Sequence, residues 1–154
     1  MKNQKPLSIY IHIPFCEKRC PYCDFKSMGP ADKQIITKYV DNLCDEIKEG
    51  STKAKDRIVN TIYFGGGTPS FVDTAHVLKI LDCIKINFGV SKNSEITIEC
   101  NPNCLDRTKI VFYRMIGFNR ISIGVQSFDD ATLKVLGRLH TAQHTKNAIE
   151  IDDK

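Results

Sequence analysis

Four short runs of β-branched and apolar residues alternate along this chain with segments of helical periodicity. The runs span residues 8–13, 58–64, 95–100 and 120–126. Apolar residues in the intervening segments recur every three to four positions, which is typical of amphipathic helices. A strand–helix order repeated in this way favours parallel strands joined by right-handed crossovers. The sequence therefore predicts an α/β fold with four parallel βα units.

The ends of the helices are expected where local capping residues occur. Apolar spacing over 35–47 predicts the first helix, with Gly50 as its stop. Asp73 can cap the second helix, whose apolar face consists of Val77, Ile80, Leu81 and Ile84. A third helix is expected over 106–116, ending near Gly117.

The segment after the fourth run is expected to be helical as well. Ser127 and Asp130 have the spacing of a capping box. A further helical piece is expected to start near Thr141.

The expected strands have one apolar and one polar face. Tyr10 and His12 share a face in the first run, because successive strand residues point to opposite sides. The corresponding polar residues are Glu95, Thr97 and Glu99 in the third run, and Ser122, Gly124 and Gln126 in the fourth. A sheet covered by helices on both sides would bury two apolar faces. A polar inner wall instead fits a barrel that holds a ligand at the carboxyl ends of its strands.

The length of the chain limits this barrel. A complete eight-unit barrel needs about 200 to 250 residues, whereas the chain has 154. Four units make half of a barrel, so we expect either a partial barrel or completion by another chain.

Composition and charge give no support to several classes of protein. The net charge is +4 and both signs are mixed, which gives no reason to expect nucleic acid or an anionic membrane as partner. No apolar run approaches the length of a membrane span. The polar start at 1–6 does not resemble a signal peptide, so we expect a cytoplasmic protein.

Three of the seven cysteines form the motif Cys16-x-x-x-Cys20-x-x-Cys23. A disulfide framework is not expected in the cytoplasm, and a local cysteine cluster there indicates metal or redox chemistry. Thiolates select iron–sulfur clusters, zinc or copper(I). A four-iron cubane usually takes four cysteines, so three would leave one iron open for another ligand. The alternative of structural zinc normally requires four protein ligands, and the sequence has no second cysteine pair of suitable spacing.

A glycine-rich turn, Gly65-Gly66-Gly67-Thr68-Pro69, follows the second run. Glycines at the end of a strand let backbone N–H groups approach a ligand closely. The turn lacks the GK[ST] ending of a nucleotide-binding P-loop. Such turns are common, so this one indicates a ligand site only in combination with the cysteine motif.

Four motifs together resemble one known family, that of the oxygen-independent coproporphyrinogen III oxidases. They occur in the order Tyr10-Ile-His-Ile-Pro-Phe-Cys16, Cys20-Pro-Tyr-Cys23, Tyr63-Phe-Gly-Gly-Gly-Thr-Pro69 and Gly124-Val-Gln-Ser-Phe128. The resemblance implies a radical S-adenosylmethionine (SAM) barrel with a [4Fe-4S] cluster on the three motif cysteines. It also implies that residues 1–154 are the N-terminal part of such a domain, without the remaining barrel units and C-terminal domain.

The resemblance further implies which residues contact SAM. Tyr10 would lie near the cluster, Tyr22 would pack on SAM, and the glycine turn would receive its methionine end. The full implied set is Tyr10, Tyr22, Gly66, Gly67, Thr68, Glu99, Gln126 and Arg138. Glu99 and Gln126 also belong to the polar face inferred from the strand pattern, which is independent support.

One position departs from the oxidases of this family. Oxidases are expected to have a fourth cysteine two residues after the third, where this chain has Phe25. The form Cys-Pro-Tyr-Cys-Asp-Phe instead resembles the heme chaperone (HemW-type) branch. This resemblance implies a protein that binds heme and passes it to acceptor proteins without oxidase activity.

Three hypotheses follow from the sequence. The favoured one is a heme chaperone that keeps the cluster and has heme and a heme-acceptor protein as partners. The second is an anaerobic coproporphyrinogen III oxidase, which would use an electron donor to cleave SAM and act on a porphyrinogen. The third is an inactive truncated product, because half a barrel exposes two strand edges.

Overall fold

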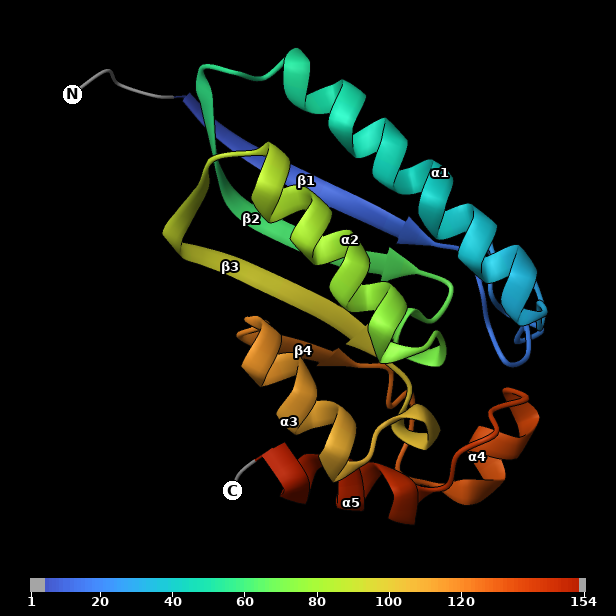
Figure 1. Cartoon of the computed structure of the whole chain (residues 1–154). Coiled ribbons are helices and arrows are strands. Elements are labelled where there is room, and N and C mark those ends of the chain that lie inside the picture. The colour runs from blue at the N-terminus through green and yellow to red at the C-terminus, as the bar shows by residue number, and fades with distance from the viewer. Residues whose placement is uncertain (1–4, 153–154) are drawn as a thin grey trace.

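The computed structural model describes residues 5–152 of the chain. Its strands form one parallel sheet in sequence order, as Figure 1 shows. The strands are β1 (Lys5–Ile13), β2 (Arg57–Gly66), β3 (Val90–Cys100) and β4 (Arg120–Ile123). The predicted α/β fold with four parallel βα units is therefore confirmed.

Helices follow the strands in the expected order. They are α1 (Lys33–Thr52), α2 (Thr74–Asn87), α3 (Arg107–Ile116), α4 (Asp130–Val135) and α5 (Ala142–Asp152), with short 3-10 turns η1 (Pro69–Phe71) and η2 (Pro102–Cys104). Figure 1 shows α1 and α2 side by side across one face of the sheet.

The hydrophobic core lies between the sheet and these helices. The inward side chains of the strands include Ile11, Ile13, Ile62, Phe64 and Ile98, each at most 2% exposed. The apolar face predicted for α2 is buried in full. Burying an aliphatic or aromatic side chain stabilises a fold by about 1.5–3 kcal/mol, so this layer holds the sheet and helices together. The opposite face of the strands remains polar, as the alternation predicted.

The expected stop of the first helix at Gly50 is wrong, because α1 continues to Thr52. Gly50 does not adopt the left-handed conformation that ends many helices. The hydroxyl groups of Ser51 and Thr52 instead donate to carbonyl groups three residues earlier, at 2.7 Å each, and satisfy part of the last turn.

The start of α4 also differs from the expected capping box of Ser127 and Asp130. Asp129 is the N-cap, and its carboxylate accepts a hydrogen bond of 2.7 Å from the backbone N–H of Thr132. Ser127 lies two residues before this N-cap, and its hydroxyl oxygen accepts from the N–H of Asp129.

Three cysteines belong to the buried core. Cys44, Cys83 and Cys100 are each at most 8% exposed. Burial, with the nearby Cys83 thiol, raises the pKa of Cys44 to about 11. Burial raises the pKa of Cys100 to about 12. These thiols are packed core residues, whereas Cys20 and Cys23 of the motif are only half-buried.

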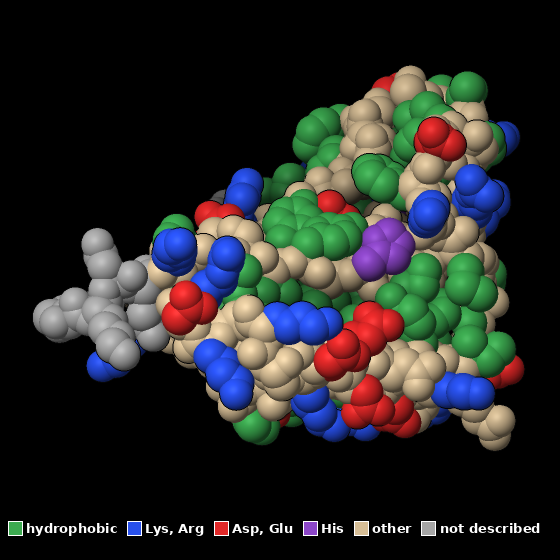
Figure 2. Space-filling model, turned by 90° about the horizontal axis from the view of Figure 1, so that it is seen from above, with side chains coloured by type: hydrophobic (Ala, Val, Ile, Leu, Met, Phe, Trp, Pro, Cys, Tyr) green, Lys and Arg blue, Asp and Glu red, His purple; other side chains and the backbone are tan. Residues whose placement is uncertain are grey.

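The charged side chains of both signs are mixed on one face of the molecule (Figure 2). On the face that Figure 2 shows, Lys and Arg side chains are interspersed with Asp and Glu. Between residues 5 and 152, no helix is both long and apolar enough to cross a membrane.

We predict that Asp106→Ala lowers the free energy of unfolding by about 1 kcal/mol, because the Asp106 carboxylate caps α3. This carboxylate accepts a 2.8 Å hydrogen bond from the N–H of Lys109. Asp73→Ala is the matched control, since Asp73 precedes α2 but makes no side-chain capping bond. Urea denaturation measures both, and equal losses would contradict the assignment of the cap.

We also predict that Cys44 and Cys100 resist alkylation in the folded, metal-free chain. The thiolate is the reactive form, and thiols with such raised pKa values are almost fully protonated at about pH 8. Brief iodoacetamide treatment followed by peptide mass spectrometry should label Cys20 and Cys23, which are only half-buried. If Cys44 and Cys100 were labelled as fast as Cys20 and Cys23, the hydrophobic core would be accessible to solvent, which would contradict the prediction.

Candidate cofactor site

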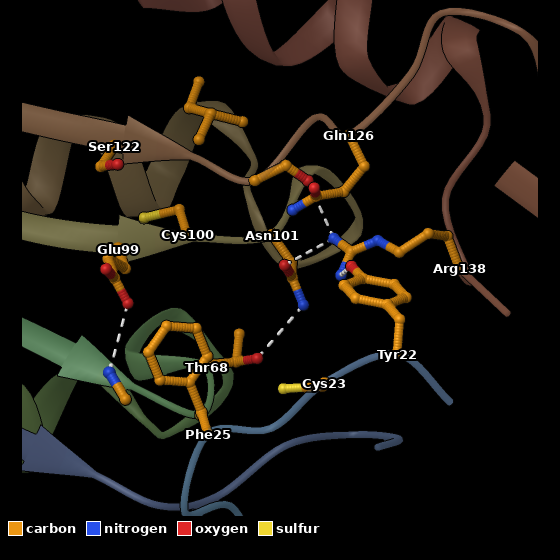
Figure 3. Close-up of a pocket in the computed structure, with 14 residues that line it drawn as sticks. Tyr22, Cys23, Phe25, Thr68, Glu99, Cys100, Asn101, Ser122, Gln126 and Arg138 are labelled. Carbon is orange, nitrogen blue, oxygen red and sulfur yellow. Dashed lines mark hydrogen bonds between the residues drawn. The ribbon is translucent and has the colours of Figure 1, made fainter. Parts of the chain in front are cut away.

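A cavity of about 350 Å³ lies at the carboxyl ends of the strands. Figure 3 shows its labelled side chains around a common space. Of the residues assigned to SAM by resemblance, those that line it are Tyr22, Gly66, Gly67, Thr68, Glu99, Gln126 and Arg138, and Cys23 lines it too. The structure thus brings these distant positions together, whereas Tyr10 lies outside the lining.

The cysteine loop begins where β1 ends and is closed at its base by backbone hydrogen bonds. The N–H of Cys16 donates to the carbonyl of Met28 at 3.1 Å, and the N–H of Met28 donates to that of Pro14 at 2.6 Å. The Nε2–H group of His12 donates to the carbonyl of Lys26 at 2.8 Å. These bonds fix both ends of the segment that carries the motif.

The three motif sulfurs face different partners. The Thr68 hydroxyl donates to the Sγ of Cys16 at 3.5 Å, and the Nη1 of Arg138 donates to the Sγ of Cys20 at 3.6 Å. Burial is the main cause that raises the pKa of Cys16. Cys23 is half-buried at the cavity wall.

The sulfurs do not converge on a single point. Within residues 5–152, no three His, Cys, Asp or Glu side chains are close enough together to hold one metal ion. A tetrahedral zinc ion requires such convergence, whereas the corners of a cubane are separate iron atoms, each with its own cysteine. The loop supplies three cysteines, and three cysteines can bind three corners of a cubane and leave the fourth iron for another ligand.

The glycine turn packs tightly against the first residues of the cysteine loop. Gly66 has a φ of +115°, and a Cβ there would lie 2.7 Å from the His12 ring. A Cβ on Gly67 would lie 2.8 Å from the backbone of Pro14 and Phe15. Only glycine allows this approach, which sets the turn directly beside the motif.

The N–H groups of the turn are already used within the protein. Gly66 donates to Glu99, Gly67 to the carbonyl of Ile13, and Thr68 to that of Phe15, at 3.2, 2.8 and 2.8 Å. The sequence suggested that these groups would face a ligand. Any contact of the turn with a ligand has to use other atoms.

Glu99 lies at the centre of the polar face. Its carboxylate accepts from the hydroxyl of Tyr63 at 2.6 Å and from the N–H of Gly66 at 3.2 Å. The hydrogen bond to Glu99, with burial, raises the pKa of Tyr63. Tyr10 stacks on Tyr63 with ring centroids 6.1 Å apart, and so lies next to the site without lining the cavity.

Gln126 reaches the cavity from a loop and not from a strand. The fourth strand was expected to extend to residue 126, but β4 ends at Ile123. Gln126 then adopts a φ of +65°, the only positive φ of a non-glycine residue in the described part of the chain. Non-glycine residues whose backbone is held in this sparsely populated region cluster at functional sites, which makes Gln126 a candidate site residue.

Asn101 is a site residue that sequence reasoning missed. Its Oδ1 accepts from the Nη2 of Arg138 at 2.7 Å, and its Nδ2 donates to the Thr68 hydroxyl at 3.1 Å. Arg138 also donates to the carbonyl of Gly124 at 2.9 Å. The Asn-Pro sequence after β3 predicted the end of a strand, and nothing local in it indicated these distant partners.

Phe25, which stands where oxidases are expected to have a fourth cysteine, lines the cavity and is 66% exposed. An exposed aromatic side chain at a cavity wall offers an apolar surface to a bound molecule.

Comparison with known proteins identifies the family. The model of the radical SAM superfamily matches residues 10–151. The heme chaperone HemW of Escherichia coli is 41% identical over 151 residues, which are 98% of this chain and 40% of that protein. The oxygen-independent coproporphyrinogen III oxidase of Salmonella typhimurium is 33% identical over 135 residues, 88% of this chain and 30% of that enzyme.

The solved structure of coproporphyrinogen III oxidase (HemN) from Escherichia coli, a radical SAM enzyme, superposes with a TM-score of 0.91 at 29% identity. The match covers 97% of this chain and 35% of that structure. The chain spans about 40% of the length of the heme chaperones that it matches. The family model covers nearly all of the chain and the likeness extends through the whole described fold, so the chain belongs to the radical SAM superfamily.

Proposed function

We propose that Cys16, Cys20 and Cys23 hold a [4Fe-4S] cluster and that the adjoining cavity binds SAM, as part of a heme chaperone. One observation carries the proposal: the cysteine loop lies at the wall of a cavity. Polar residues that follow or end each of the four strands line this cavity. Heme, a heme-acceptor protein and an electron donor are the partners we propose, in the cytoplasm.

The residues around the cavity suit the amino acid part of SAM. The Arg138 guanidinium would bind its carboxylate, and the Glu99 carboxylate would bind its amino group, because opposite charges attract in a partly desolvated site. Tyr22 and Phe25 offer aromatic surface to its apolar parts. A bound and reduced cluster would supply one electron to the sulfonium of SAM, and the role of the cavity residues would be to orient SAM and exclude water.

Two observations favour a chaperone over an oxidase. Phe25 occupies the position of the additional cysteine expected in oxidases. The heme chaperones compared are 35–41% identical to this chain, against 33% for the Salmonella oxidase. The structural likeness to HemN keeps coproporphyrinogen oxidation as the second candidate function.

We predict that anaerobic reconstitution gives four iron and four sulfide per chain in the wild type, as a cubane contains, and no cubane in Cys20→Ala. Cys104→Ala is the matched control, because Cys104 is a half-buried thiol outside the motif and should leave the cluster intact. Iron and sulfide analysis with electron paramagnetic resonance (EPR) measures the outcome. A stable cluster in Cys20→Ala would contradict the ligand assignment.

We predict that the cluster-loaded chain binds heme and does not convert coproporphyrinogen. Heme binding is measured by absorbance titration, and conversion by product analysis with SAM and a reductant present. The Salmonella oxidase provides the positive control for conversion. Turnover by this chain would reverse the ranking of the two functions, and absence of heme binding would count against the chaperone.

A further inference from the structure

A continuous network of hydrogen bonds joins two of the motif cysteines through Asn101. Asn101 accepts from Arg138, which donates to Cys20, and it donates to Thr68, which donates to Cys16. Figure 3 shows Asn101 between Thr68 and Arg138 at the cavity. One amide side chain thus lies between the two groups that donate hydrogen bonds to sulfur.

The chemistry of these groups fixes the direction of each bond. A guanidinium can only donate, so the Asn101 oxygen must face Arg138 and its NH₂ group must face Thr68. The Thr68 oxygen therefore accepts from Asn101, and its own proton is left to point at Cys16. The amide of Asn101 thus determines that Thr68 acts as a donor toward sulfur.

Asn101 is itself held firmly. Its N–H donates to the hydroxyl of Ser70 at 3.2 Å, and its carbonyl accepts from the N–H of Cys104 at 2.9 Å. Ser70 is fully buried and Thr68 is 4% exposed, so water competes little for these bonds. The Nη2 of Arg138, which donates to the Asn101 oxygen, also donates to the carbonyl of Gly124 at 2.9 Å, so this donor is held in place from a second side.

We infer that Asn101 is a positioning residue that sets the reduction potential of the cluster by directing two donors onto Cys16 and Cys20. The inference rests on the cluster assignment proposed above. Hydrogen bonds to cysteine sulfurs are among the determinants of iron–sulfur potentials. Reduction adds negative charge to the cluster, so donors on its sulfurs stabilise the reduced form and raise the potential.

The test is an EPR-monitored redox titration of the reconstituted chain. In Asn101→Leu, a side chain of similar size makes neither bond, so the midpoint potential should become more negative while iron and sulfide content stay at the wild-type value. Asn42→Leu is the matched control, because Asn42 is exposed on α1 and does not line the cavity. The midpoint potential of the cluster in this variant should equal that of the wild type.

Asn101→Asp tests the same inference if Asn101→Leu does not fold. Its carboxylate still accepts from Arg138 but cannot donate to Thr68, so the Thr68 proton turns toward the carboxylate and away from Cys16. The lost donor and the added charge both make the potential more negative. If either variant folds, takes up the cluster and has the wild-type midpoint potential, the inference about Asn101 is wrong but the proposed function stands. If the wild-type chain takes up no cluster, both the inference and the proposed function are wrong.

Discussion

The close approach of the glycine turn after β2 to the first residues after β1 is the constraint on which the rest of the site depends. A Cβ on Gly67 would lie only 2.8 Å from the backbone of Pro14 and Phe15. Backbone bonds from Gly67 to Ile13 and from Thr68 to Phe15 then join the two segments. The cysteine loop starts from this point, so the turn determines where the three sulfurs lie.

The parallel sheet makes this arrangement possible. Because all four strands run in one direction, their carboxyl ends meet at one edge, and each following segment contributes a different group to the cavity. The cysteines follow β1, the turn ends β2, Glu99 lies at the end of β3, and Gln126 follows β4. The sheet supplies a rigid base, and the exposed loops carry the chemistry.

Much of this could be predicted from sequence, because it depends on local periodicity. The alternation in β1 and β3 placed Tyr10 and Glu99 on the polar face, and the helical spacing from Val77 to Ile84 identified the buried face of α2. The motif spacing placed the cysteines in one loop.

The features that sequence reasoning missed depend on long-range contacts. Asn101 bonds to side chains 33 and 37 residues away, so no local pattern could indicate its role. β4 ends at Ile123, where the N–H of Val125 donates to the carbonyl of Ile123 in a tight turn, although residues 124–126 read as a continuing strand. The backbone partners of the glycine turn became visible only when the turn and the cysteine loop were packed together.

Mössbauer spectroscopy of the chain, reconstituted with isotopically enriched iron and recorded with and without SAM, tests the central claim most directly. Three cysteine ligands leave one iron of a cubane without a protein thiolate. The account predicts that one iron site differs from the others and that its signal changes when SAM is added. A spectrum in which SAM alters no iron site, or in which no cubane is present, would contradict it.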